Sequence, residues 1–159
     1  MNVFEENAGK LNGLQQLQAM IAGAPRPPIA DTLDFNLVEI EEGRAVFEGI
    51  PGKHAYNPLG SVHGGYAATL LDSACGCAVH SCLKADQAYT TLELKIAYHR
   101  AMTVDTGPVR AEARVITLGK RVAFTEGRIT DASGNIYASA TSTLILIEPQ
   151  AAMERSPKP

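Results

Sequence analysis

The chain of 159 residues contains no tryptophan, few aromatic residues and no apolar run near the roughly 18 residues that a membrane-spanning helix needs. Its first residues, Met1 to Asn7, have neither the positive charge nor the apolar stretch of a secretory signal. Charged residues make up only 19% of the chain, with a net charge of -3, so no basic face could neutralise nucleic-acid phosphates. We therefore expect a cytoplasmic protein that binds neither membranes nor nucleic acids.

Cysteine is scarce as well, and the three cysteines lie close together at Cys75, Cys77 and Cys82. An odd, clustered set is a poor disulfide framework, so we interpret these residues as small buried hydrophobic side chains in a reducing compartment. Two residues apart on a helix, Cys75 and Cys77 would point about 200° away from each other and could not bind the same metal ion. We expect no metal site and no cofactor.

Apolar residues recur at helical spacing near the N-terminus and at alternating spacing further along the chain. The first pattern predicts an amphipathic helix from Leu11 to Ile21, followed by a proline-rich linker at 25–28. The second pattern predicts six strands, at residues 33–40, 45–50, 90–100, 109–118, 121–130 and 136–147. In the third strand, the alternation places four apolar residues on one face: Leu92, Leu94, Ile96 and Tyr98.

The stretch from Gly64 to about Cys82 is apolar on nearly every side, which is typical of a helix enclosed by other structure. It separates the first two strands from the last four, and no second alternation of strand and helix follows. This order predicts an α+β fold in which one antiparallel sheet wraps around one long central helix. We assign residues 1–28 to an extra N-terminal helix and linker, 29–149 to the folded domain and 150–159 to a solvated tail.

A sheet of this kind leaves two edge strands whose backbone groups have no partner. Pairing two copies of the chain edge to edge would cover one edge of each copy. The sequence therefore favours a homodimer.

One carboxylate, Asp72, lies within the apolar stretch that predicts the central helix. An ionised carboxylate in apolar surroundings costs several kcal/mol unless it is paired, so Asp72 is either partnered, close to solvent at an interface, or used chemically. A structural aspartate that binds an arginine or the backbone of a neighbouring subunit would give the same sequence. Asp72 alone does not decide between these alternatives.

The helix begins at His63-Gly64-Gly65, where two glycines leave the first backbone N–H groups uncovered by side chains. An oxygen that carries negative charge could approach these N–H groups and the positive end of the helix dipole, as in an oxyanion hole. The structural alternative is a glycine-rich turn that only lets the chain enter the helix. Along one helix, His63 and Asp72 are about 13 Å apart, too far to reach the same reacting atom. Either they are unrelated, or Asp72 works with the glycine turn of a second subunit.

Two patterns in the chain occur together in a known family. The first is Asn57-x-x-Gly60-x-x-His63-Gly64-Gly65 followed by Asp72, and the second is Thr91-x-Glu93-x-x-Ile96-x-Tyr98-x-Arg100. Together they resemble the hot-dog-fold acyl-CoA thioesterases, in the phenylacetyl-CoA/4-hydroxybenzoyl-CoA thioesterase branch. The resemblance covers about residues 30–148. It implies a hot-dog fold, a homodimer whose two sheets join into one, a further pairing into a dimer of dimers, and an active site at the subunit interface.

The resemblance also implies roles for individual residues. The Gly64 N–H would polarise the thioester carbonyl, with Asn57 and His63 beside it, while Asp72 of the partner would attack the carbonyl or activate water. Thr91 would supply a hydroxyl that orients the water. A thioester suits such a site, because its carbonyl is reactive and its thiolate leaves readily, so one carboxylate and one set of donors can suffice. The expected substrates are acyl-CoA thioesters with small to medium acyl groups, aromatic ones included.

CoA carries phosphates that the protein has to meet. We expect four residues to bind the substrate and its CoA: Gly65, beside the expected thioester position, and Arg100, Lys120 and Arg121, as candidates for the phosphates. The chain departs from the family here, reading Tyr98-His99-Arg100-Ala101 where many relatives have Arg-Pro. We expect structural or solvated roles for the remaining histidines, His54, His80 and His99.

Two other functions remain open at this point. The same fold hosts acyl-thioester dehydratases and hydratases, in which a histidine and a carboxylate carry out acid–base chemistry, and His63 with Asp72 could serve that purpose. The chain could also be a non-catalytic acyl-CoA-binding module, although such a module has no need of Asp72.

Overall fold

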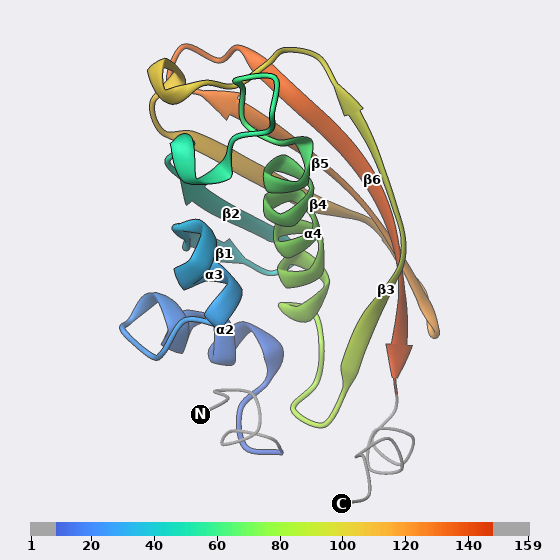
Figure 1. The fold of residues 1–159 in the computed structure, drawn as a ribbon. Helices are drawn as coiled ribbons and strands as arrows, with labels where there is room; N and C mark the ends of the chain where they lie inside the picture. The colour runs from blue at the N-terminus through green and yellow to red at the C-terminus, as the bar shows by residue number, and fades with distance from the viewer. Residues whose placement is uncertain (1–8, 148–159) are drawn as a thin grey trace, which may run out of the picture.

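A long helix, α4 (Gly64–His80), lies in the hollow of a six-stranded antiparallel sheet (Figure 1). The computed structural model describes residues 9–147. In spatial order, the strands of the sheet are β1 (Phe35–Glu41), β2 (Arg44–Gly49), β4 (Val109–Leu118), β5 (Val122–Asp131), β6 (Ile136–Ile147) and β3 (Ala88–Tyr98). This arrangement confirms the expected α+β hot-dog architecture. The predicted tail, residues 150–159, lies outside the described residues.

The central helix packs closely on the sheet because both surfaces carry small side chains. Ala45, Ala111 and Ala113 are fully buried on the sheet, and Ala74 and Ala78 are fully buried on α4. Gly127 of β5 shows how little space is left. A Cβ atom at position 127 would lie 3.2 Å from the Cβ of Ala113 and 3.3 Å from the side chain of Leu71 on α4. The sequence pattern that predicted an enclosed helix therefore reflects a real close approach.

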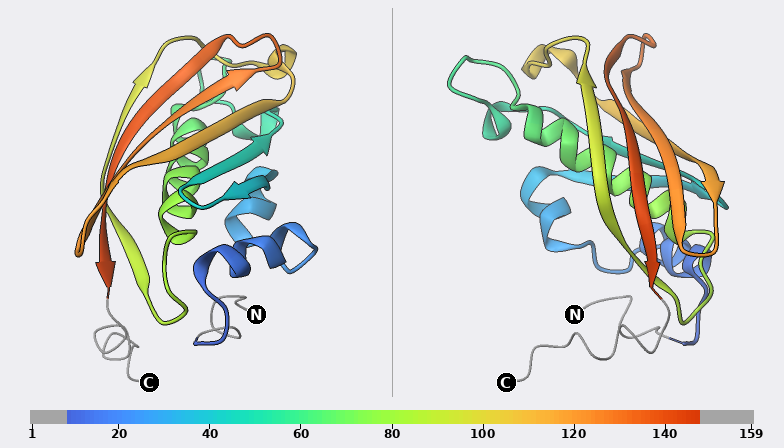
Figure 2. Two further views of the ribbon diagram at one scale, coloured as in Figure 1. Left: turned by 180° about the vertical axis from the view of Figure 1, so that it is seen from behind. Right: turned by 90° about the vertical axis from the view of Figure 1, so that its right-hand side faces the viewer.

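The described helices all lie on one side of the sheet, so its outer face is left uncovered (Figure 2). That face carries charged side chains, among them Arg44, which forms ion pairs with Glu39 at 2.8 Å and Glu112 at 3.1 Å. The two edge strands are β1 and β3. Two short helices, α2 (Gly13–Ile21) and α3 (Pro28–Leu33), contact β1. In the described part of the chain, no helix is both long and apolar enough to cross a membrane.

The helix α3 was missed by the sequence analysis, which assigned 25–28 to a linker and began a strand at residue 33. Pro28 occupies the first position of this helix, where proline is well tolerated because its missing N–H has no helical partner there. The helix ends at Asp34, whose backbone is left-handed with φ 51°. The strand therefore begins at Phe35. The loop predicted at 51–62 also contains a short 3₁₀ helix, η1 (Lys53–Ala55).

The predicted face of β3 was also partly wrong. Leu92 was expected to share a face with Leu94 and Ile96, but it is 59% exposed, whereas Leu94 and Ile96 pack against the core. The reason is a shift in the pairing of β3 with β6 between Thr91 and Glu93. An irregularity of this kind inserts an extra residue, so the alternation before it and after it differs by one position.

The N-terminal helix α2 packs against the C-terminal end of α4. Gly13 makes this approach possible, because a Cβ atom there would lie only 1.7 Å from the backbone oxygen of His80. The Gly13 N–H donates to the oxygen of Leu83 at 3.0 Å, and the His80 ring and the Gln16 side chain form a buried hydrogen bond of 2.9 Å. Because the Gln16 amide nitrogen donates to the oxygen of Leu11, its oxygen faces His80 and accepts from Nε2.

Burial of His80 makes the stability of the protein depend on pH. Burial lowers the pKa of His80 from 6.5 to about 4, so between these values the unfolded chain binds a proton that the folded chain does not. Protons therefore favour unfolding as the pH falls through this window, and the free energy of unfolding should drop by about 1–2 kcal/mol from pH 7 to pH 5. Urea titrations at both pH values measure the drop. It should shrink in His80→Gln and persist in His54→Gln, whose ring is exposed; equal drops in all three proteins would contradict this account.

Candidate active site

His63 caps the N-terminus of α4. Its backbone is extended, with φ -62° and ψ 137°, and its ring Nδ1 accepts a hydrogen bond of 2.8 Å from the Gly65 N–H. Because Nδ1 is an acceptor, the neutral ring carries its proton on Nε2. The ring is exposed, so the cap leaves an Nε2–H donor at the start of the helix. The H-G-G turn therefore does more than let the chain enter the helix.

Gly64, the first residue of α4, is held between the cap and the edge strand β3. The Tyr98 hydroxyl donates to the Gly64 carbonyl at 3.1 Å, and a Cβ atom at position 64 would lie 3.0 Å from the Tyr98 ring and hydroxyl. The peptide that joins Gly64 to Gly65 is thus bonded at both ends, its carbonyl to Tyr98 and its N–H to His63. Within the described residues, no acceptor bonds to the Gly64 N–H, which leaves it as the available donor at the positive end of the helix dipole.

A cavity of about 510 Å³ opens at this end of α4. It is lined by His63, Gly64, Gly65, Tyr98, Arg100, Met102 and Tyr137, together with neighbouring residues. The Arg100 guanidinium lies 5.7 Å from the centre of the Tyr137 ring, a cation–π distance. Of the predicted CoA-binding residues, Gly65 and Arg100 therefore lie at the same cavity as His63 and Gly64.

Asn57 lies in the loop that leads to His63, and its side chain is bonded within that loop. Its oxygen accepts from the N–H of Leu59 at 2.9 Å and of Ser61 at 3.3 Å, and its amide nitrogen donates to the Ser61 hydroxyl at 3.1 Å. In the single chain, Asn57 therefore shapes the approach to the helix. The contact with a substrate carbonyl, which the resemblance implies, stays a prediction.

Asp72 lies on the face of α4 that the sheet leaves partly open, with Gly65, Ala68, Thr69 and Ser73. One of its oxygens, Oδ1, accepts a hydrogen bond of 2.9 Å from the Thr91 hydroxyl of β3. In the described part of the chain, Oδ2 accepts no hydrogen bond and Asp72 forms no ion pair. The carboxylate is thus oriented through one oxygen and leaves the other available. An intrachain arginine partner, one form of the structural alternative, is not what holds Asp72.

The titratable groups near Asp72 are held in their neutral forms. Burial, with a smaller contribution from the charge of Asp72, raises the pKa of Cys75 to about 11 and that of Cys77 to about 12. Burial also raises the pKa of Tyr89 well above its usual value. Because neither thiol nor phenol ionises near pH 7, none of them competes with Asp72 as a base or nucleophile. Among the described residues, no three His, Cys, Asp or Glu side chains gather as metal ligands.

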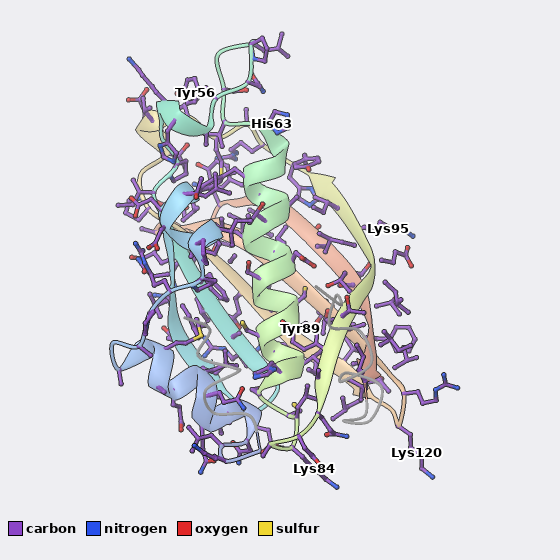
Figure 3. All side chains as sticks on the ribbon, turned by 60° about the horizontal axis from the view of Figure 1, so that its bottom comes forward. Tyr56, His63, Lys84, Tyr89, Lys95 and Lys120 are labelled. Carbon is purple, nitrogen blue, oxygen red and sulfur yellow. The ribbon has the colours of Figure 1, made fainter. Side chains whose placement is uncertain are left out.

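Side chains of strand β3 contact α4 along much of its length. Tyr98 bonds to Gly64, Thr91 bonds to Asp72, and Tyr89 packs on Gly76, where a Cβ atom would lie 2.5 Å from its hydroxyl. Figure 3 shows Tyr89 between the lower part of α4 and β3. Thr91 and Tyr98 would face opposite sides of a regular strand, and the irregularity between Thr91 and Glu93 brings both toward the helix. The sequence placed Tyr98 on the same face as Leu94 and Ile96, as observed, but began the strand at Thr90 and so left Tyr89 outside it.

A single chain keeps the two halves of the predicted site apart. Because α4 is continuous from Gly64 to His80, Gly64 and Asp72 are separated by about 12 Å along its axis. The first half, at the start of the helix, comprises His63, Gly64 and the cavity beside them; the second comprises Asp72 and Thr91. No bend in the helix brings these halves together.

The predicted basic residues are also divided. Lys120 and Arg121 lie at the β4–β5 hairpin, where the Arg121 carbonyl accepts a hydrogen bond of 2.8 Å from the Leu146 N–H. Arg100 lies elsewhere, because the N–H groups of His99 and Arg100 both donate to the Tyr137 carbonyl. Tyr137 and Leu146 lie at opposite ends of β6, about 30 Å apart by the rise of an extended strand. Figure 3 shows Lys120 at the hairpin tip, far from His63. The three cations therefore do not meet one CoA molecule within one chain.

A second, larger cavity of about 770 Å³ lies among side chains of β3, β4, β5 and β6, including Lys95, Arg114 and Arg128. His99 lines both cavities and forms a hydrogen bond of 2.8 Å with the Ser139 hydroxyl. Neither Asp72 nor Gly64 reaches this larger cavity. The arrangement of donors and carboxylate thus places the candidate site at α4, although the hollow there is smaller.

Comparison with known proteins identifies the family of the chain. A family model described as the thioesterase superfamily matches residues 59–138, which include His63, Asp72 and Thr91. A 1,4-dihydroxy-2-naphthoyl-CoA hydrolase of Listeria monocytogenes is 27% identical over 116 residues, which are 73% of this chain and 93% of that protein. A candidate esterase of Saccharolobus solfataricus is 34% identical over 117 residues, covering 72% of this chain and 80% of that one.

Solved structures lead to the same family. A candidate thioesterase of Ralstonia eutropha, related to phenylacetic acid degradation, is 26% identical with a TM-score of 0.73, over 81% of this chain and 98% of that one. Together with the sheet that wraps around α4, these likenesses show that the chain belongs to the thioesterase superfamily, has its hot-dog fold and is a thioester hydrolase.

Proposed function

We propose that two copies of the chain form a shared site that hydrolyses acyl-CoA thioesters, with Asp72 and Thr91 from one copy and His63 and Gly64 from the other. The observation that carries this proposal is the separation of about 12 Å between Gly64 and Asp72 on one rigid helix. Each half is prepared for chemistry but incomplete. One half has donors and no base, and the other has a carboxylate and no donors for a carbonyl oxygen.

The donors at the start of α4 suit the oxygen of a thioester carbonyl. The Gly64 N–H and the His63 Nε2–H lie at the positive end of the helix, where they would stabilise the negative charge that develops on this oxygen in the transition state. Preorganised donors of this kind contribute a factor of about 10²–10³ each in other enzymes. No cofactor is required, since the thiolate of CoA is itself a good leaving group.

The carboxylate of Asp72 supplies the attacking oxygen in one of two ways. As a general base, its free oxygen takes a proton from water while the water oxygen bonds to the carbonyl carbon and the C–S bond breaks. As a nucleophile, the same oxygen bonds to the carbonyl carbon and expels CoA, and water then hydrolyses the anhydride. In both cases the Thr91 hydroxyl holds the other oxygen of the carboxylate and fixes its direction.

The edge strand β3 supports a homodimer in which the two sheets join. It has 11 residues, one side of its backbone faces no other strand of the described sheet, and it carries both Thr91 and Tyr98. Pairing β3 with its copy would bring the open faces of the two α4 helices toward one shared region. A further pairing into a dimer of dimers and a location in the cytoplasm stay predictions from the sequence.

The proposed substrates are acyl-CoA thioesters with small to medium acyl groups, including aromatic ones. Tyr98, Tyr137 and Met102 give the cavity at α4 an apolar and partly aromatic wall, and a relative is named for a naphthoyl-CoA substrate. Arg100 lines this cavity and is the proposed partner of a CoA phosphate, while Lys120 and Arg121 would have to act on CoA bound mainly by another copy.

The test of this function is the release of CoA thiol from acetyl-, hexanoyl-, phenylacetyl- and hydroxybenzoyl-CoA. We expect turnover of at least one of these thioesters, with an aromatic one among those that react fastest. The alternative dehydratase activity predicts instead the hydration of a 2-enoyl-CoA without thiol release. Binding of all four thioesters with neither reaction would identify a non-catalytic acyl-CoA-binding module.

A further inference from the structure

Tyr98 is the residue of β3 that holds the peptide on which the proposed carbonyl-binding donor depends. Its hydroxyl donates to the Gly64 carbonyl at 3.1 Å, and its ring lies so close that a Cβ atom at position 64 would be 3.0 Å from it. The other end of the same peptide, the Gly65 N–H, donates to His63 at 2.8 Å. The first peptide of the helix is therefore fixed from two sides, by the cap and by the edge strand.

We propose that Tyr98 is a positioning residue for thioester hydrolysis, which holds the start of α4 so that the Gly64 N–H points at the substrate carbonyl oxygen. This inference rests on the proposed role of the Gly64 N–H. The preceding peptide, which carries the Gly64 N–H, is held at its carbonyl end, because the Tyr66 N–H donates to the His63 oxygen at 2.9 Å. The Gly65 N–H is already occupied by its hydrogen bond to His63 Nδ1, so this N–H does not bind substrate.

The contact also explains why position 64 is glycine. The backbone of Gly64 is not in the left-handed region, so no conformational requirement demands glycine there. The requirement is space for the Tyr98 side chain. Tyr98 itself is 58% exposed, so its removal opens no cavity in the core and should cost little stability. A loss of activity would therefore reflect the position of the donor and not a damaged fold.

The expected effect appears in kcat and not in KM. For acetyl-CoA, whose acyl group is too small to depend on the Tyr98 ring as a wall, we expect Tyr98→Leu to lower kcat about tenfold and to change KM by less than about twofold, because small errors in donor geometry affect the transition state most. Tyr98→Phe, which keeps the ring contact, should lose less. Tyr56→Phe is the matched control for Tyr98→Phe, since the Tyr56 hydroxyl also bonds to a backbone group, which is the Val104 N–H at 2.9 Å and not a group of α4.

A spectroscopic measurement separates this role from a structural one. The probe is an unreactive acyl-CoA ketone, in which a methylene group replaces the sulfur and the carbonyl carbon is ¹³C-labelled. In the wild type, the infrared band of the bound carbonyl should lie at lower frequency than in water, and in Tyr98→Leu it should return toward the value in water. The same carbonyl frequency and the same kcat in the wild type and in Tyr98→Leu would overturn the role of Tyr98. No shift in the wild type itself would instead contradict the proposed donor.

Discussion

Asp72→Asn is expected to lower kcat/KM for acyl-CoA by about a hundredfold or more. Asparagine has the size of aspartate and keeps an oxygen that can accept the hydrogen bond from Thr91, so the local structure should persist. It has no charge and no basic oxygen, so it can neither take a proton from water nor attack a thioester. The measurement is CoA thiol release under kcat/KM conditions, with urea unfolding of both proteins as the check on folding.

Asp86→Asn is the matched control, because Asp86 is an exposed aspartate in the turn between α4 and β3. It should leave the rate within about twofold of the wild type, as expected for a surface change away from the site. If Asp72→Asn were equally harmless, Asp72 would be a structural carboxylate. A single turnover in ¹⁸O-labelled water then tests the nucleophilic role, since label in the side chain of Asp72 shows that an anhydride formed and that water attacked its Asp72 carbonyl.

The overall architecture could be predicted because the local patterns agree with the fold. The small, apolar residues from Gly64 onward predicted the central helix, and strands β4 and β6 have the predicted bounds. The helix α3 could not be predicted in the same way. It is one short segment beginning at a proline, and the pair Pro27-Pro28 is as typical of a linker as of the start of a helix.

The residues of the candidate site could be predicted from the sequence, but most of their contacts could not. The motif named His63, Gly64, Asp72 and Thr91, but a strict alternation puts Thr91 and Tyr98 on opposite faces of β3. The shifted pairing between Thr91 and Glu93 turns both side chains to the same face. This shift depends on how β3 pairs with β6, and no local pattern in the sequence of β3 indicates it. The separation of Lys120 from Arg100 likewise follows from the sheet topology.

The second large effect concerns the Gly64 N–H. Gly64→Pro removes this N–H, and the backbone tolerates it, because proline suits the first position of a helix and His63 is already extended with ψ 137°. Gly64→Ala is the matched variant, since it pushes on Tyr98 in the same way but keeps the N–H. We expect Gly64→Pro to be about a hundredfold slower than the wild type and clearly slower than Gly64→Ala. Equal rates for the two variants would remove the Gly64 N–H from the chemistry.

Combining two inactive variants tests most directly whether the site is shared. Asp72→Asn chains keep intact donors and Gly64→Pro chains keep an intact carboxylate, so a site formed by one chain of each kind can carry both functional halves. Equal co-expression of the two should then restore thiol release to about one quarter of the wild-type rate, because a random site draws each intact half with a probability of about one half. Activity no higher than that of the two variants alone would contradict the account and place the whole site within one chain.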